Sequence, residues 1–305
     1  MERFTTLRFI SSLLIFLLFI NCQKDEDMSV LTILMSQQKL PSEVNIIISG
    51  QSIAQGQYPA STSGYSSAKL NNVNATYLEC KTATHTWEQF TNKMMSPYQY
   101  SDPAVYGCSL EYSLAEYYTE QGITFNLYKP AWGAQKFGTD ASPGKFHVSS
   151  FTLGSLDQTT FDSLIFGEIT QDIVDIMIEQ KADGVTFNSF LWMHGESDGR
   201  DALDSRNAYE TNLRRFIEVI RFIQPNIPFY IRILPPETED WMGAVVAGGR
   251  DAINTAITNV ASDTPYVYTI TMPSPFSQGD DIHPSNPVGN DQMALAYWNV
   301  LKLHL

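Results

Sequence analysis

The stretch that decides the fold is Glu43–Ser52, with the sequence EVNIIISGQS. Val44 to Ile48 is a short apolar run rich in β-branched residues and is followed by Ser49-Gly50, a pattern that predicts a buried strand ending in a tight turn. A serine hydroxyl is an effective nucleophile only when a base adjoins it and the backbone holds it exposed. Ser52, two residues past the glycine, is therefore the candidate nucleophile. Taken alone, the pattern fits equally well a plain strand-to-helix turn with Ser52 as the N-cap.

Strands and helices alternate after this stretch. Apolar runs predict further strands at 75–80, 123–131, 185–192, 227–234 and 266–270, and helical spacing predicts helices at 109–121, 166–180, 202–223, 250–260 and 287–303. This order predicts an α/β fold with an open parallel sheet of about five strands, covered by helices on both faces. In such sheets the functional site lies beyond the carboxyl ends of the strands. The irregular segment 82–105 is rich in aromatic residues, which fit either the core or a wall that faces a sugar.

The first 41 residues predict export. Residues 1–21 carry two arginines and then an apolar run too short to span a bilayer, which is typical of a signal peptide. Cys22 directly after it resembles the lipidated cysteine of bacterial lipoproteins; the alternative is an ordinary secretion signal with an incidental cysteine. Residues 22–41 begin with a charged, non-periodic piece and predict a tether, which leaves 42–305 as the folded domain. We therefore expect an exported protein anchored to a membrane through a lipid on Cys22, in the periplasm or on the outer cell surface.

The charge of the chain limits its partners. The net charge is −14, and removal of residues 1–21, which hold one Glu and two Arg, makes it −15. So acidic a protein is not expected to bind nucleic acid, and it offers no attraction to anionic substrates. Neutral, polar partners such as uncharged glycans fit this balance.

The cysteines and the glycine pattern give no sign of a metal or a cofactor. Cys80 and Cys108 are the remaining cysteines, and in an oxidising compartment they either pair or stay as buried thiols. Neither has the neighbouring cysteine or histidine spacing of a zinc site. No phosphate-binding glycine loop or nucleotide fingerprint appears, so we expect no cofactor.

A candidate base lies near the end of the chain. Residues 279–284 read GDDIHP. An imidazole titrates near neutral pH and suits a serine nucleophile, while a carboxylate three residues earlier can hold its second nitrogen. These roles give a predicted triad of Ser52, His283 and Asp280, with Asp281 as the competing carboxylate.

Motifs of one family occur here in order. They are Gly50-Gln51-Ser52, then Gly133 after a predicted strand, then Trp192–Asp198 as WMHGESD, then the DDIHP stretch at 280–284. In these motifs residues 44–305 resemble the SGNH hydrolases, and within them the sialate O-acetylesterase-like and carbohydrate esterase family 6 acetylesterases. The resemblance implies a three-layer α/β/α, flavodoxin-like sheet with Ser52 as nucleophile and His283 and Asp280 delivered from one loop.

The resemblance also implies an oxyanion hole. Its donors would be the backbone N–H groups of Ser52 and Gly133 and a side chain at the position of His194. This chain departs from the family at two places: Ile53 stands where Asn is frequent, and His194 stands where Gln is usual. A neutral imidazole can donate from one nitrogen, so a working hole would depend on its tautomer and on pH.

Other residues of these motifs are expected to support the site. Gln51 belongs to the nucleophile motif, and Glu196 and Asp198 are expected to orient the loop that carries His194, not to transfer protons.

The sequence thus predicts a serine hydrolase that removes acetyl groups from a polysaccharide or glycan through an acyl-enzyme. One alternative is an esterase of broader acyl specificity. The other is a glycan-binding lipoprotein that kept the fold and lost turnover, with Ile53 and His194 as signs of the loss.

Overall fold

The computed structural model describes residues 40–56, 65–79, 85–90, 109–200, 203–238, 247–276, 282–285 and 287–305. Residues Ser42–Leu305 form one compact unit. The strands are β1 (Glu43–Gly50), β2 (Ala75–Glu79), β3 (Thr86–Gln89), β4 (Thr124–Tyr128), β5 (Gly138–Thr139), β6 (Ser142–Pro143), β7 (Ser189–Met193), β8 (Phe229–Arg232) and β9 (Val267–Ile270). The α-helices are α3 (Ser52–Gln55), α4 (Ser67–Leu70), α5 (Glu111–Glu120), α6 (Gln158–Ser163), α7 (Glu168–Ala182), α8 (Glu196–Arg200), α9 (Leu203–Ile223), α11 (Gly249–Asp263) and α12 (Val288–Leu301), with a 3-10 turn at Pro236–Thr238. The predicted signal peptide, the lipidation site and residues 22–39 of the predicted tether, together with Cys80, Cys108, Asp280 and Asp281, lie outside the described residues.

Seven of the described strands form one sheet in the order β3-β2-β4-β1-β7-β8-β9. All neighbouring pairs are parallel except β2 and β3. The predicted α/β fold with a central parallel sheet is therefore confirmed, but the expected number of about five strands is too low. The segment around 86–89 was expected to be irregular. Its sequence TWEQ has no apolar alternation, and β3 exists because it pairs with β2.

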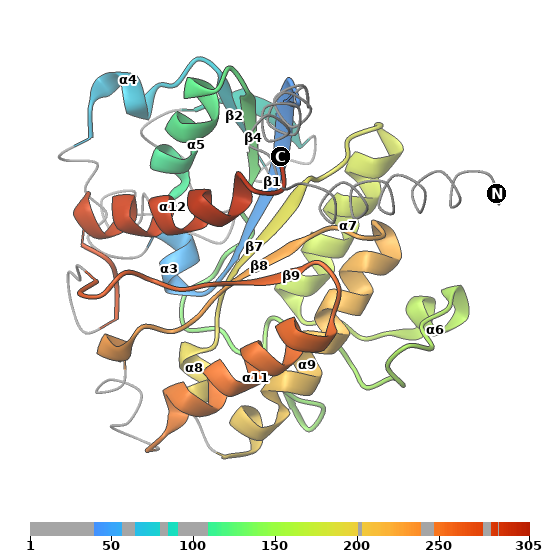
Figure 1. Cartoon of the computed structure of the whole chain (residues 1–305). Coiled ribbons are helices and arrows are strands. Elements are labelled where there is room, and N and C mark those ends of the chain that lie inside the picture. Colours follow the sequence, from blue (N-terminus) through green and yellow to red (C-terminus); the bar gives the residue numbers. More distant parts are fainter. Residues whose placement is uncertain are drawn as a thin grey trace, which may run out of the picture. The chain divides into compact units, whose positions relative to one another are not determined.

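Different helices cover the two faces of the sheet (Figure 1). Along β1, Val44, Ile46 and Ile48 point to the face that α3, α5 and α12 cover, whereas Ile47 points to the face that α7, α9 and α11 cover. Successive side chains of a strand point to opposite faces, so the consecutive apolar residues Ile46, Ile47 and Ile48 fit a strand that is buried on both sides. β1 is the middle strand of the sheet, and its carboxyl end leads directly to Ser52.

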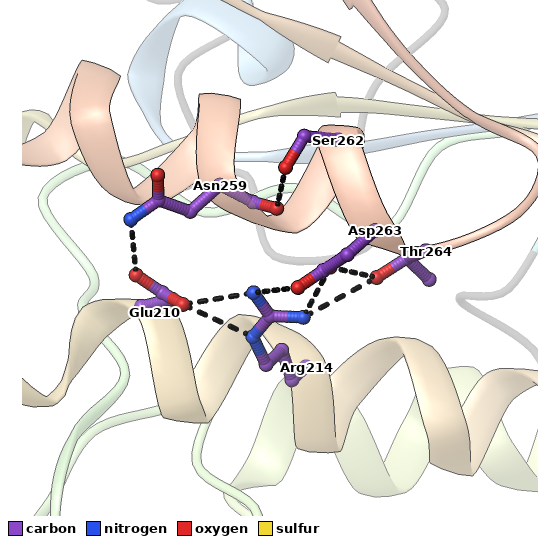
Figure 2. Close-up of polar contacts among 6 residues, drawn as sticks. All are labelled: Glu210, Arg214, Asn259, Ser262, Asp263 and Thr264. Carbon is purple, nitrogen blue, oxygen red and sulfur yellow. Dashed lines mark hydrogen bonds and ion pairs between the residues drawn. The ribbon is translucent and has the colours of Figure 1, made fainter.

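A polar network fastens α11 to α9 (Figure 2). Arg214 of α9 donates to Glu210 on the same helix at 2.8 Å and to Asp263 at the end of α11 at 2.7 Å. Asn259 of α11 donates to Glu210 at 2.9 Å. The hydrogen bond from the Arg214 guanidinium holds the pKa of the Asp263 carboxyl below its ordinary value. These side chains are partly or largely exposed, so the network aligns the helices more than it stabilises them.

The other end of α11 supports α8. A Cβ atom at Gly249 would lie 2.2 Å from the carbonyl oxygen of Gly199, so the backbones of α11 and α8 are in close contact there. α8 follows β7 at the carboxyl edge of the sheet. The pair α9 and α11 thus supports the loop that carries the WMHGESD motif.

The turn after β1 depends on Gly50. This residue has φ +136°, and a Cβ atom there would lie 1.9 Å from the carbonyl oxygen of Met193. We expect Gly50→Ala to lower the free energy of unfolding by about 2–3 kcal/mol, measured by urea denaturation, because the turn must move away from β7. Gly184→Ala is the control. This residue has φ +83°, but a Cβ atom there would have no neighbouring atom within 4 Å. We expect this variant to lose about 1 kcal/mol of unfolding free energy. Equal losses in the two variants would contradict the proposed close packing against Met193.

None of the described helices is long and apolar enough to cross a membrane. In the same part of the chain, no group of three or more His, Cys, Asp or Glu side chains is placed to hold a metal ion.

Candidate active site

Ser52 lies where three segments of the chain meet. The N–H of Gln51 donates to the carbonyl oxygen of Met193 in β7 at 2.9 Å, and the N–H of Trp132 donates to that of Gly50 at 3.1 Å. The turn between β1 and α3 is thereby held by β7 on one side and by the segment after β4 on the other. Ser52 is the first residue of α3 and is 9% exposed.

His283 contacts Ser52 although 231 residues separate them. The distance from its Nε2 to Ser52 Oγ is 2.7 Å. His283 precedes α12, and Ser285 holds the start of that helix by accepting hydrogen bonds from the N–H of Gly289, at 3.1 Å through its Oγ and at 2.8 Å through its carbonyl oxygen. An imidazole nitrogen at this distance can take the hydroxyl proton of Ser52. The sequence-predicted pair is thus brought together, whereas Asp280 and Asp281 lie outside the described residues and the third member of the triad stays a prediction.

The backbone N–H of Gly133, a predicted donor of the oxyanion hole, already donates a hydrogen bond within the protein. It donates to Oε1 of Gln55 at 2.7 Å. Gln55 ends α3, three residues after Ser52, and is 2% exposed. The Ser52 N–H, at the first position of α3, has no acceptor among the described residues. Of the two backbone donors expected for an oxyanion hole, the Ser52 N–H thus has no acceptor among the described residues, whereas the Gly133 N–H is bonded to Gln55.

The structure buries His194, the residue predicted as a side-chain donor of the oxyanion hole. Its ring is fully buried and lies against aromatic rings, with centroid distances of 4.8 Å to both Phe137 and Trp192 and 5.0 Å to Phe146. No hydrogen bond joins it to Ser52 in the part of the chain that the structure describes. Burial lowers the pKa of His194 to about 3, so the imidazole is neutral at physiological pH. His194 is a core residue here because it faces the same side of the sheet as Trp192.

Gln51 links two of the loops around Ser52. Its side-chain amide donates to the carbonyl oxygen of Gln135 and accepts a hydrogen bond from the N–H of Ser197 at 3.3 Å. The side chain is 2% exposed. Gln51 therefore connects the turn that carries Ser52 to the segments after β4 and β7.

Glu196 and Asp198 also occupy supporting positions in the loop after β7. Glu196 forms an ion pair with Arg232 at the end of β8, and both side chains are buried. Asp198 accepts hydrogen bonds from Ser205 Oγ at 2.7 Å and from the N–H of Phe137 at 3.4 Å. Its Oδ2 lies 3.7 Å from Nδ1 of His194. Glu196 thus holds the Arg232 side chain, and Asp198 holds the Ser205 side chain and the backbone of Phe137.

Asp198 makes stability depend on pH. Burial raises its pKa from 3.8 to about 7. The folded protein therefore keeps a proton on Asp198 between pH 4 and 7 that the unfolded chain has released. The resulting stabilisation is complete below pH 4 and is lost as pH rises through 7. We expect the wild type to lose about 2 kcal/mol or more of unfolding free energy relative to Asp198→Asn between pH 4.5 and pH 8.

The control for this prediction is Asp263→Asn. The pKa of Asp263 is lowered in the folded protein. The unfolding free energy of the wild type should therefore rise slightly relative to that of Asp263→Asn when pH rises from acid values. A constant difference between the wild type and Asp198→Asn from pH 4.5 to 8 would contradict the raised pKa of Asp198.

Comparisons with known proteins bear on the fold. No profile of a known protein family and no curated protein matches this sequence. Solved structures do match. A protein from Arabidopsis thaliana has a TM-score of 0.58 at 14% identity, covering 86% of this chain and 99% of its own. The structure named NanS has a TM-score of 0.58 at 11% identity, covering 87% and 99%.

A third structure, described as a carbohydrate acetylesterase from Xanthomonas citri, has a TM-score of 0.53 at 14% identity. The match covers 85% of this chain and 56% of that one. At such identities the likeness concerns the fold. It agrees with the α/β fold predicted from the sequence, and the resemblance to SGNH hydrolases rests on the motifs.

Proposed function

We propose that this chain, which has the SGNH-hydrolase fold, is a carboxylic ester hydrolase that removes acetyl groups from a carbohydrate. The observation that carries the proposal is the 2.7 Å contact between Ser52 Oγ and His283 Nε2 at the carboxyl edge of the sheet. The order of the motifs and the description of the Xanthomonas citri structure as a carbohydrate acetylesterase support the acetylated carbohydrate as substrate.

The chemistry proceeds in two halves. Ser52 Oγ attacks the acetyl carbonyl carbon while His283 Nε2 takes its proton, and the same nitrogen then protonates the leaving sugar oxygen. Water, deprotonated by His283, then attacks the acetyl-Ser52 ester, and the same nitrogen returns the proton to Ser52 Oγ as acetate leaves. The remaining role, holding the second nitrogen of His283, belongs in this proposal to Asp280.

Negative charge develops on the acetyl carbonyl oxygen when Ser52 attacks and again when water attacks. Hydrogen-bond donors must stabilise it in both steps. In the proposal these are the N–H groups of Ser52 and Gly133. Oε1 of Gln55 occupies the Gly133 donor in the free protein at 2.7 Å, so the substrate carbonyl oxygen replaces an amide oxygen that binds there in the same way.

We further propose that the domain is exported and held at a membrane by a lipid on Cys22. The net charge of −14 favours an uncharged polysaccharide over an anionic glycan.

Acetate release tests the proposal. Purified protein is incubated with acetylated xylan, p-nitrophenyl acetate and p-nitrophenyl butyrate. We expect acetate from the first two and slower hydrolysis of the butyrate, because an acetyl-specific site has no room for a longer acyl chain. Faster hydrolysis of the butyrate would instead indicate an esterase of broader acyl specificity.

A second candidate is a glycan-binding protein without turnover. The burial of His194 and the occupied Gly133 N–H favour it, because they leave one open donor where the family pattern implies three. No hydrolysis of any of these esters or of acetylated sialic acid by folded protein would favour this candidate.

A further inference from the structure

A polar hollow lies at the edge of the sheet opposite to Ser52. Its volume is about 580 Å³, and its lining includes Glu43, Asn45, Thr76, Trp87, Asn126 and Asn188. Glu43 begins β1, Thr76 is the second residue of β2 and Asn126 is the third of β4, whereas Ser52 follows the carboxyl end of β1. Since a strand rises about 3.3 Å per residue, the eight residues of β1 place Glu43 roughly 23 Å from Gly50, which lies two residues before Ser52.

A row of polar side chains crosses three strands at the floor of this hollow. The strand register sets Thr76 beside Asn126 and Asn126 beside Asn45. Thr76 Oγ1 donates to Asn126 Oδ1 at 2.6 Å, and Asn126 Nδ2 donates to Asn45 Oδ1 at 2.9 Å. Asn45 Nδ2 donates to the carbonyl oxygen of Thr186 at 3.0 Å. The row is thus held in one fixed orientation before any ligand binds.

The asparagines in and beside this row have hydrogen-bond donors that the bonds above do not use. Each amide nitrogen carries two hydrogens, and the bonds above use one on Asn126 and one on Asn45. Asn188 accepts the N–H of Asn45 through Oδ1 at 2.7 Å, and its own nitrogen has no acceptor among the described residues. One N–H on Asn126, one on Asn45 and two on Asn188 are therefore unused in this part of the chain.

Trp87 adds an aromatic surface. It is half-buried in β3, and its Nε1 donates to Gln180 Oε1 of α7 at 3.0 Å, which fixes the ring at the side of the hollow. A fixed indole offers a large surface at little cost in conformational entropy, and a sugar ring can pack on it.

The charges around the hollow exclude an anion. Glu43 and Asp183 are the charged side chains among the described residues that line it, and neither is basic. Their carboxylates accept hydrogen bonds from hydroxyl groups, while the unused amide hydrogens donate to hydroxyl oxygens. Groups that both donate and accept, on a ring that can pack against an indole, are the chemistry of a sugar.

We propose that the polar hollow binds a neutral saccharide chain, separately from the site at Ser52. It would hold a polysaccharide on the protein while the site at the other edge acts on its own target. Because the two sites use different edges of the sheet, the inference does not depend on Ser52 being a catalyst.

The test is calorimetric titration of xylohexaose and mannohexaose into protein carrying Ser52→Ala, which removes turnover. We expect at least one of the two to bind with a dissociation constant of about 1 mM or tighter. Asn188→Asp keeps the oxygen that accepts from Asn45 and removes both free N–H groups, and we expect at least about tenfold weaker binding. Trp87→Ala should weaken binding to a similar degree, with Trp87→Phe in between.

The control is Asn299→Asp on α12, where Oδ1 accepts from Lys302 at 2.7 Å. It adds the same charge at an exposed site and should leave binding unchanged. Hydrolysis of p-nitrophenyl acetate by the Trp87 and Asn188 variants, made with Ser52 intact, should match that of the wild type. Absence of binding of both hexasaccharides, or binding that neither Asn188→Asp nor Trp87→Ala weakens, would overturn the proposal whether or not the protein hydrolyses esters.

Discussion

Replacing Ser52 with alanine is expected to abolish ester hydrolysis by this protein, with kcat falling on the order of 10⁴-fold or more. The reason is that the attacking atom itself is lost, while the fold is kept. Ser52 Oγ is hydrogen-bonded to His283 at 2.7 Å. The comparison is made on p-nitrophenyl acetate with a urea denaturation of each variant, and the unfolding midpoint should change little.

Two further variants make this prediction specific. His283→Ala should cause a loss of similar size, and the Ser52→Ala/His283→Ala double variant should be no slower than either single one, because the two side chains act as one unit. Ser155→Ala removes another hydroxyl, which donates to the carbonyl oxygen of Thr152 at 2.6 Å, and should keep full activity. Additive losses in the double variant would contradict a shared role.

Removing Arg232 should have the largest effect on stability. Arg232 and Glu196 form an ion pair in which both side chains are buried. Burial lowers the pKa of Arg232 to about 10, so the guanidinium is still charged at pH 7. Arg232→Met leaves the Glu196 carboxylate buried without its cation. We expect a loss of about 3–5 kcal/mol of unfolding free energy, measured by urea denaturation at pH 7.

A double variant separates the attraction between the two charges from the free-energy cost of burying them. Glu196→Gln/Arg232→Met removes both charges and should recover most of the lost stability, since desolvation of the two ions offsets much of their attraction. Arg214→Met is the matched control, because its partners Glu210 and Asp263 are partly or largely exposed (Figure 2). We expect that variant to lose at most about 1 kcal/mol. Similar losses for the two arginines would show that burial does not set the effect.

The elements with strong apolar periodicity were predictable from sequence. β1 and α9 lie within a few residues of their expected ends, because an apolar strand and an amphipathic helix each reveal their buried face. β3 was not expected. Its four residues carry no such pattern, and its pairing with β2 is a tertiary contact.

The pairing of Ser52 with His283 was also predictable, because each follows a strand and strand ends gather at one edge of the sheet. The direction of His194 was not inferred, although a signal existed. Side chains two residues apart on a strand share a face, and Trp192 lies in the core. The contact of Gln55 with Gly133 joins α3 to the segment after β4, and no local pattern encodes it.

The most direct test of the account is covalent labelling of Ser52. Folded protein is treated with phenylmethylsulfonyl fluoride, and the modified peptide is identified by mass spectrometry. The account predicts one sulfonyl ester, on Ser52, absent in Ser52→Ala and formed at least about 100-fold more slowly in His283→Ala. Labelling of another serine, or an equal rate without His283, would contradict the assignment of Ser52 and His283 as nucleophile and base.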